Sequence, residues 1–376
     1  MSTPAAARAV TVRTPGFLVG VLGTAFVVAL GFGLIAPILP LFADALGASY
    51  SGASLVITVF AGVRLLSSAP AGALVDRVGA RATVAAGLLI VAASSAATAY
   101  AATFLQLLVL RGAGGVGSAL FITGLGQHIV RLIPPAERGR ANGMLQGAFL
   151  LGGVSGPVVG GYLVQAGGFE PPFLIYAAGL VVATVVTLRF LSTSTHAGEA
   201  ATTIADAEFG ATDDHVVAPT HAATAAPPGI GAMLRDRTFL AALVVAGAVS
   251  WGSQGVRLAA VPLFGDDVLH LEPGVVGLAL TVASACHALM LWPSSQYADR
   301  RGRRTPLRVG TAVYVVAMFG LAFATDAAGL IIALGAQGLA AGAASTMPSA
   351  VVGDLAPPGA EGKAVGVLSA AQDVAV

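Results

Sequence analysis

Long apolar runs separated by short polar stretches make up most of the chain. They predict ten membrane-length helices at 16–42, 51–72, 82–101, 104–128, 141–166, 171–191, 238–264, 273–296, 306–325 and 328–351, with an eleventh beginning near 364. A helix needs about 20 apolar residues to cross the hydrocarbon core of a bilayer, and these runs have that length. Strands of a membrane barrel would be about 10 residues long and would alternate strictly, so we expect an all-α polytopic membrane protein.

The amino-acid composition also indicates a membrane protein. Hydrophobic residues make up 56% of the 376 positions and charged residues 10%, whereas soluble domains carry roughly 25% charged residues. Most of the surface is therefore expected to face lipid. The net charge of +1 gives no reason to expect a nucleic-acid partner, and the single cysteine, Cys286, excludes an internal disulfide and a multi-cysteine metal site. We expect no cofactor and no metal.

Arginine and lysine are distributed unevenly. Sixteen of the 19 lie in the N-terminal tail, in or beside every second connection, and in the central polar segment, whereas the alternate connections carry acidic residues. Loops rich in these cations stay in the cytoplasm, which predicts a cytoplasmic N-terminus. The excess of arginine over lysine is typical of bacteria with high GC content, so a bacterial inner (plasma) membrane is expected. The other three, Arg64, Arg111 and Arg257, fall inside predicted helices.

A short motif occurs twice along the chain. Asp-Arg-x-Gly-x-Arg stands at 76–81 and again at 299–304, so that Asp76 and Asp299 are 223 positions apart. The pairs Pro134-Pro135 and Pro357-Pro358 keep the same spacing. The repeat predicts two halves of the same orientation, which is characteristic of transporters with a substrate site at the midplane between the halves.

The repeat also sets the domain organisation. Residues 1–191 contain six predicted helices, residues 192–236 read as a flexible cytoplasmic linker, and residues 237–376 begin a second set of six. The offset places the end of a complete second set about 38 residues beyond Val376. Helix 11 is therefore expected to be incomplete in this sequence and helix 12 absent.

The first copy of the motif, GALVDRVGAR at 72–81, resembles the signature Gly-x-Leu-x-Asp-Arg-x-Gly-x-Arg of the major facilitator superfamily. The resemblance extends over essentially the whole chain. In that family the aspartate closes the cytoplasmic side against helix 11, so the resemblance implies a latch at Asp76; for the arginines, orientation of the helices alone is the alternative. The residues assigned to this gate are Gly72, Asp76, Arg77, Gly79, Arg81, Asp299, Arg300, Gly302 and Arg304.

A second motif lies in helix 4. RGAGGVG at 111–117 resembles the family's Arg-x-x-x-Gly-x-Gly element, matched by Arg111, Gly115 and Gly117. A charge about 10 Å from the helix end is costly in lipid and usually faces the bundle interior or a cavity. The resemblance implies a part in proton coupling for Arg111; an arginine that reaches outward to the interface is the alternative.

A third motif lies in helix 5, which reads LGGVSGPVVGGYL. Glycines four residues apart share one face and permit another helix to pack at backbone distance, and a proline bends the span. The pattern resembles the antiporter signature Gly-x-x-x-Gly-Pro-x-x-Gly-Gly, which in the family accompanies export, although packing alone would also explain it. LGFGLIAPILPLF at 30–42 resembles the first-helix element of the twelve-helix drug–proton antiporters. The matching residues are Gly152, Gly156, Pro157, Gly160, Gly161, Gly31, Gly33, Pro37 and Pro40.

Four ionisable residues are candidates for function within the membrane. Arg64 in helix 2 and His287 in helix 8 occupy equivalent places in the repeat, which favours a position at a cavity between the halves. Asp373 is expected near the midplane of helix 11, where a carboxylate could bind and release a proton; His287 is the other candidate carrier, or a hydrogen-bonded structural histidine. Arg257 is a candidate counter-ion or substrate contact, and Pro37 and Pro40 are candidate cavity residues.

These patterns together predict a proton-coupled secondary transporter that exports small lipophilic or amphipathic molecules by alternating access, and not an enzyme. An uptake permease for a small metabolite and a membrane sensor that does not transport stay open as alternatives. No Gly-x4-Gly-Lys-Ser/Thr loop for ATP occurs, which favours energy from an ion gradient. Expected partners are the small-molecule substrate, protons and the bilayer, and the fold requires only one chain.

Overall fold

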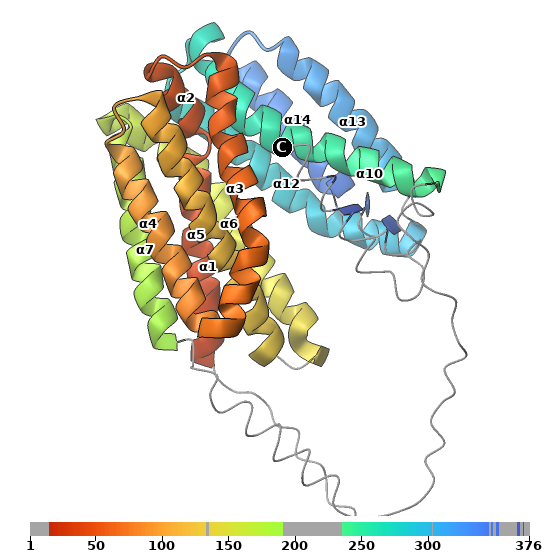
Figure 1. Ribbon diagram of the computed structural model, residues 1–376. Helices are drawn as coiled ribbons and strands as arrows, with labels where there is room; N and C mark the ends of the chain where they lie inside the picture. The colour runs from red at the N-terminus through yellow and green to blue at the C-terminus, as the bar shows by residue number, and fades with distance from the viewer. Residues whose placement is uncertain are drawn as a thin grey trace, which may run out of the picture.

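The computed structural model describes residues 15–132, 135–190, 235–302 and 304–345, with short stretches at 347–348, 351–352, 367–368 and 371. Within these ranges the ordered elements are helices, which confirms the expected all-α fold (Figure 1). Nearly all of the predicted linker at 192–236 and most of the predicted eleventh helix lie outside the described ranges, so the domain boundaries stay a prediction.

Seven helices make up the first half of the molecule, and the first two belong to one span. They are α1 (Pro15–Ile35), α2 (Ile38–Ala45), α3 (Tyr50–Val78), α4 (Ala80–Ala99), α5 (Phe104–Leu132), α6 (Pro135–Gly167) and α7 (Glu170–Phe190).

The described part of the second half contains four spans. Its elements are α10 (Arg237–Ser250), the π-helix η2 (Trp251–Ala260), α11 (Val261–Leu263), the π-helix η3 (Phe264–Val268), α12 (Pro273–Arg301), α13 (Arg304–Ala322) and α14 (Ala327–Ser345). Over the described residues of both halves, nine helices are long and apolar enough to cross a membrane, and the bent pair α1–α2 brings the number to ten. Ten complete crossings were expected.

The first span is broken, whereas the sequence predicted one continuous helix over 16–42. The axes of α1 and α2 differ by 41°. Pro37 accounts for the break, because its ring has no N–H to donate and crowds the carbonyl four residues earlier. α2 then runs past the predicted end to Ala45, and Pro40 lies in its first turn, where N–H groups have no helical partner.

The seventh span also departs from the uniform helix predicted over 238–264. A π-helix is wider than an α-helix, and the change of winding leaves carbonyl groups without their usual partners. The Tyr314 hydroxyl donates to the Val249 carbonyl at 3.3 Å, and the Gln337 amide donates to the Gly252 carbonyl at 3.2 Å. Side chains of α13 and α14 therefore stabilise the irregular winding of η2.

The internal repeat holds for helix boundaries as well as for the motif. α3 and α12 each have 29 residues, and prolines occupy equivalent places in them, Pro70 and Pro293. Each helix ends at a glycine in the left-handed region, Gly79 with φ 86° and Gly302 with φ 91°. Residues with a Cβ are strained there, so both copies use glycine for the same turn.

The bundle has two chemically different ends. We call the end at which α3 and α12 begin the acidic end, because Asp44, Asp267 and Glu272 lie there. The opposite end, which contains the turns at Gly79 and Gly302, is the basic end.

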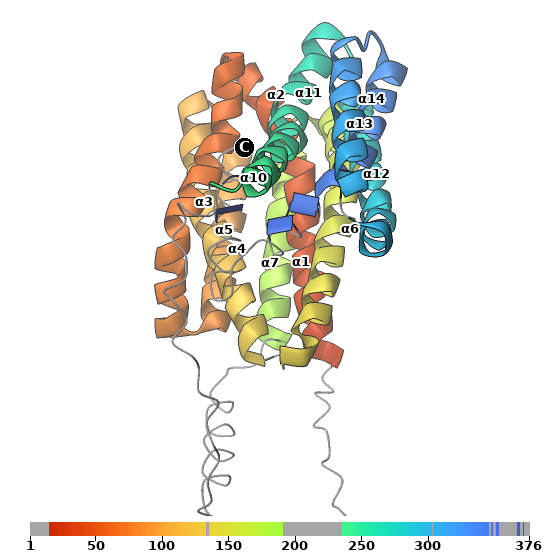
Figure 2. The same ribbon diagram turned by 90° about the vertical axis from the view of Figure 1, so that its right-hand side faces the viewer.

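The two halves contact each other toward the acidic end and diverge toward the basic end (Figures 1 and 2). α6 packs against α12, and α2 packs against α11 and η2. Hydrogen bonds between described residues also join the halves at the acidic end: the Tyr50 hydroxyl donates to Asp267 at 3.0 Å, and Gln165 donates to Glu272. The structure is therefore closed between the halves at the acidic end.

Candidate binding cavity

A cavity of about 340 Å³ lies between the two halves, on the basic side of their contact. Its volume falls at the lower end of the range of about 300–1,000 Å³ that is usual for small-molecule sites. α1 and α6 supply one wall, and α10, η2, α12 and α14 supply the other. The site is thus at the interface of the halves, where the repeat predicts a substrate site.

The two walls differ in chemistry. The described lining residues of the first half are Phe32, Gly33, Phe149, Leu150, Gly153, Val154 and Pro157. These offer no side-chain hydrogen bond and no charge. The polar lining residues all come from the second half, and they are Ser250, Ser253, Arg257, Ser284, His287 and Ser345.

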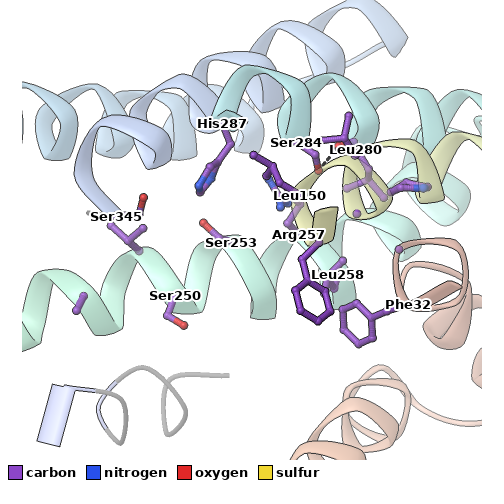
Figure 3. Close-up of a pocket in the computed structure, with 17 residues that line it drawn as sticks. Phe32, Leu150, Ser250, Ser253, Arg257, Leu258, Leu280, Ser284, His287 and Ser345 are labelled. Carbon is purple, nitrogen blue, oxygen red and sulfur yellow. Dashed lines mark hydrogen bonds between the residues drawn. The ribbon is translucent and has the colours of Figure 1, made fainter. Parts of the chain in front are cut away.

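Three of these polar groups have buried atoms without a hydrogen-bond partner in the described part of the chain: Ser253 Oγ, Arg257 Nη1 and Ser345 Oγ. In the close-up, His287 projects from α12 toward the α10–η2 helix, and Ser253 projects from that helix toward α12 (Figure 3). Buried polar groups are nearly always hydrogen-bonded, so this wall offers several groups for an additional partner.

The structure brings some of the predicted site residues to the cavity and not others. Arg257, His287 and Pro157 line it, whereas Arg64 lies on α3 outside its described lining. Pro37 and Pro40 are buried at the break of the first span. Asp373 lies outside the described residues.

Arg111 lies inside the first half. Its side chain is 2% exposed, and the guanidinium stands over the ring of Phe60 at 4.8 Å from the centroid. Tyr176 of α7 is close enough to interact with its charge, and the Tyr176 ring fills the space beside Gly31 of α1. The charge points into the interior, as expected for that depth, and a cation over an aromatic face is partly stabilised there.

The glycines of the Arg111 motif bring three helices together. A Cβ on Gly115 would lie 2.6 Å from the Phe60 carbonyl oxygen of α3, and a Cβ on Gly117 would lie 2.6 Å from the Gly87 carbonyl oxygen of α4. Only glycine permits such approach, so α5 packs at backbone distance on both neighbours.

The repeated motif lies at the basic end, at the turn between two helices in each half. α3 continues through Asp76 and Arg77, and both side chains are exposed. Arg81, at the start of α4, donates a hydrogen bond to the carbonyl of Leu188 in the last turn of α7. A cation at that position donates to a helix carbonyl that has no partner within the helix, and it interacts favourably with the negative end of the helix dipole.

The second copy of the motif is described less fully. Arg300 is exposed, and the side chains of Asp299 and Arg304 lie outside the described set. The proposed latch against helix 11 also involves residues outside it.

Helix α6 uses its glycines on two faces. Toward α1, a Cβ on Gly152 would lie 2.5 Å from the Phe26 carbonyl oxygen, a Cβ on Gly156 would lie 2.5 Å from the Gly33 carbonyl carbon, and a Cβ on Gly160 would overlap the backbone of Leu34. These contacts hold α1 and α6 together within the first half.

Toward α12, the same helix meets the second half. A Cβ on Gly161 would overlap the Pro273 carbonyl, and a Cβ on Gly277 would overlap the Pro157 carbonyl. The Val158 N–H, one residue after the proline, donates to Thr281 Oγ1 at 3.0 Å. The antiporter-like motif therefore lies at the contact between the halves as well as inside the first half.

The sequence analysis missed the cavity serines. Ser250 and Ser253 lie seven and four positions before Arg257, which was already a candidate, and this spacing places polar groups on one helix face. That spacing could have identified them.

The matching family model covers residues 21–376 and describes the Major Facilitator Superfamily. The chain belongs to this superfamily. The family resemblance predicted from the sequence is thereby confirmed.

Curated relatives align with part of the chain. An uncharacterized MFS-type transporter of Methanocaldococcus jannaschii is 31% identical over 150 residues, which are 40% of this chain and 39% of that protein. Multidrug resistance protein 1 of Bacillus subtilis is 30% identical over 166 residues, 44% of this chain and 43% of the relative. Quinolone resistance protein NorA of Staphylococcus aureus is 26% identical over 156 residues, 42% and 40% of the two chains. The match spans about two fifths of these relatives' length.

Solved structures share the fold over nearly the whole chain. A bacterial homolog of the human lysosomal transporter Spinster, in an inward-facing and unoccupied conformation, superposes with a TM-score of 0.70 at 16% identity and covers 96% of this chain and 80% of that one. A POT family transporter in complex with a thioalcohol-conjugated peptide has a TM-score of 0.68 at 14% identity, with 95% and 88% coverage. At these identities the likeness concerns the fold alone.

Proposed function

We propose that the protein is a proton-coupled secondary transporter that exports small amphipathic molecules from the cytoplasm by alternating access. The observation that carries this proposal is the cavity between the halves, with one apolar wall and one polar wall. Such a site suits a molecule that has an apolar body and a polar head. Similarity to two drug-resistance proteins supports export over uptake.

The basic end is the cytoplasmic side in this proposal, because arginine-rich connections stay in the cytoplasm. The halves touch at the acidic end, so in this proposal the described conformation is closed toward the outside. Rocking of the halves about the α6–α12 contact would close the basic end, with the Asp76 motif as its latch, and would expose the cavity outside.

Proton coupling requires a group that gains and loses a proton during this cycle. His287 lines the cavity and is the described candidate; Asp373 is the other candidate. Arg111 would act from inside the first half, through Phe60 and Tyr176, on the packing of α3, α5 and α7. A protonation change at the cavity would shift the balance between the two conformations.

Everted membrane vesicles test the proposal. Respiration acidifies their lumen, and we expect neutral or charged amphipathic compounds to accumulate inside only when the protein is present and only until a protonophore is added. The Asp76→Asn protein should reach at most about a tenth of this flux, because asparagine lacks the charge with which the latch would stabilise the closed basic end. Accumulation in right-side-out vesicles would instead identify an uptake permease. No flux in either orientation would contradict transport and favour the alternative of a membrane sensor that does not transport.

A further inference from the structure

The polar wall of the cavity carries positive charge and, among the described lining residues, no carboxylate. Arg257 contributes a permanent cation from η2. His287 of α12 lines the same cavity, close enough for an electrostatic interaction with Arg257. A cation in a low-dielectric cavity is costly unless an anion pairs with it. A lipophilic cation bound here would add another positive charge to this wall.

Hydrogen-bond donors without a partner in the described structure line the same wall. Ser253 Oγ, Ser345 Oγ and Arg257 Nη1 are buried and have no partner in the described structure, and they come from two different helices. Hydroxyl and guanidinium groups together can donate to the oxygens of one carboxylate or sulfonate.

The opposite wall fits an apolar body. Phe32 of α1 and Phe149, Leu150 and Val154 of α6 face the cavity from the first half. Aromatic and aliphatic surfaces of this kind hold a ring system or a short alkyl chain by burial of apolar area.

We propose that the preferred substrates are amphipathic monoanions, whose acid group binds Arg257 and Ser253 of η2 and whose apolar body packs on the first-half wall. The inference rests on the proposed function for the meaning of the cavity, and it narrows the substrate from any lipophilic compound to one charge class. Arg257 and Ser253 are then specificity-determining residues.

Calorimetric binding to the purified protein tests this with three probes that share one ring system: naphthalene-2-sulfonate, naphthalen-2-ylmethanol and naphthalen-2-ylmethylamine. We expect the sulfonate to bind at least about tenfold more tightly than the amine, since one charge-assisted hydrogen bond contributes that much. Arg257→Gln should weaken sulfonate binding about tenfold and leave the alcohol within about twofold. Arg257→Lys should retain most of the affinity.

Arg64→Gln is the matched control, because this arginine occupies the equivalent place to His287 in the repeat but lies outside the described cavity lining. It should bind the sulfonate as the unmodified protein does. Equal or tighter binding of the amine, an unchanged sulfonate affinity in Arg257→Gln, or binding of none of the three probes would overturn the inference.

The vesicle experiment separates this inference from the transport proposal. Proton-dependent transport of the alcohol or amine without sulfonate binding would refute the anion preference but agree with the transport proposal. Sulfonate binding as described, with no flux of any compound, would refute the transport proposal but agree with an anion-binding site in the cavity.

Discussion

Helix α6 has two glycine faces that look alike in sequence and do different things. The face with Gly152, Gly156 and Gly160 packs against α1 inside the first half, whereas Gly161 meets the start of α12 across the interface of the halves. On the first face backbone meets backbone over three successive turns. The second face has fewer close contacts and the Val158–Thr281 hydrogen bond. The difference indicates that one face is fixed while the other can separate, and substitutions can test it.

The largest effect is expected at the fixed face. Gly156→Ala would place a Cβ 2.5 Å from the Gly33 carbonyl carbon on another helix, and backbone atoms there cannot move aside cheaply. We expect a loss of about 1–3 kcal/mol in stability, seen as a lower thermal midpoint in detergent. Gly147→Ala on the same helix is the control, since nothing lies within 4 Å of its Cβ. Equal midpoints for the two variants would contradict the close α1–α6 packing.

The next effect is expected at the separable face. Gly277→Ala would push α12 away from the Pro157 carbonyl, so the halves should come apart at the acidic end while the first half stays folded. In a protein with Cys286→Ser, cysteines placed at Tyr50 and Asp267 should then cross-link several-fold more slowly. The thermal midpoint should fall less than in Gly156→Ala. An unchanged cross-linking rate would argue against contact of the halves at this point.

A smaller effect is expected from the hydrogen bond at the same face. Thr281→Val keeps the shape of the side chain but removes the acceptor for the Val158 N–H, at a cost of about 1 kcal/mol. Hydrogen–deuterium exchange should therefore speed up about fivefold in the peptide that contains Val158, and Thr281→Ser should restore the slow rate. Exchange that is equally fast in the unmodified protein would show that the bond is not formed in solution.

Much of the fold could be predicted from the sequence because membrane helices are defined by length and apolarity. The turns at Gly79 and Gly302 and the 223-residue offset could also be predicted, because charged residues are few in this chain and the same charged motif with its glycine occurs twice. The break at Pro37 was missed because apolar residues continue through it. The π-winding of η2 was missed because it depends on Tyr314 and Gln337, which belong to other spans.

The site was less predictable than the fold. Repeat symmetry placed Arg64 and His287 together, but only His287 lines the cavity, because the first half presents α1 and α6 there and not α3. Which helix faces the cavity is a matter of packing between distant segments, and a local pattern does not contain it. The serines of α10 and η2 were visible as polar positions in the sequence. Their place in a cavity could be assigned only from the structure, which shows the apolar wall that faces them.

The smallest effect is expected at the exposed contact between α3 and η3, which also joins the halves at the acidic end. Tyr50→Phe removes the 3.0 Å hydrogen bond to Asp267, which is accessible to water and therefore contributes little. Because the bond exists only while the acidic end is closed, its loss should speed opening there and leave the thermal midpoint unchanged. A fluorescence-quenching assay with a label at the acidic end should show about a two- to fivefold shift toward the open form. Tyr100→Phe, at an exposed tyrosine of the same end in the first half, should show none. A shift of equal size in both variants would mean that the Tyr50 contact does not hold the halves together, and that the other contacts between them close the acidic end.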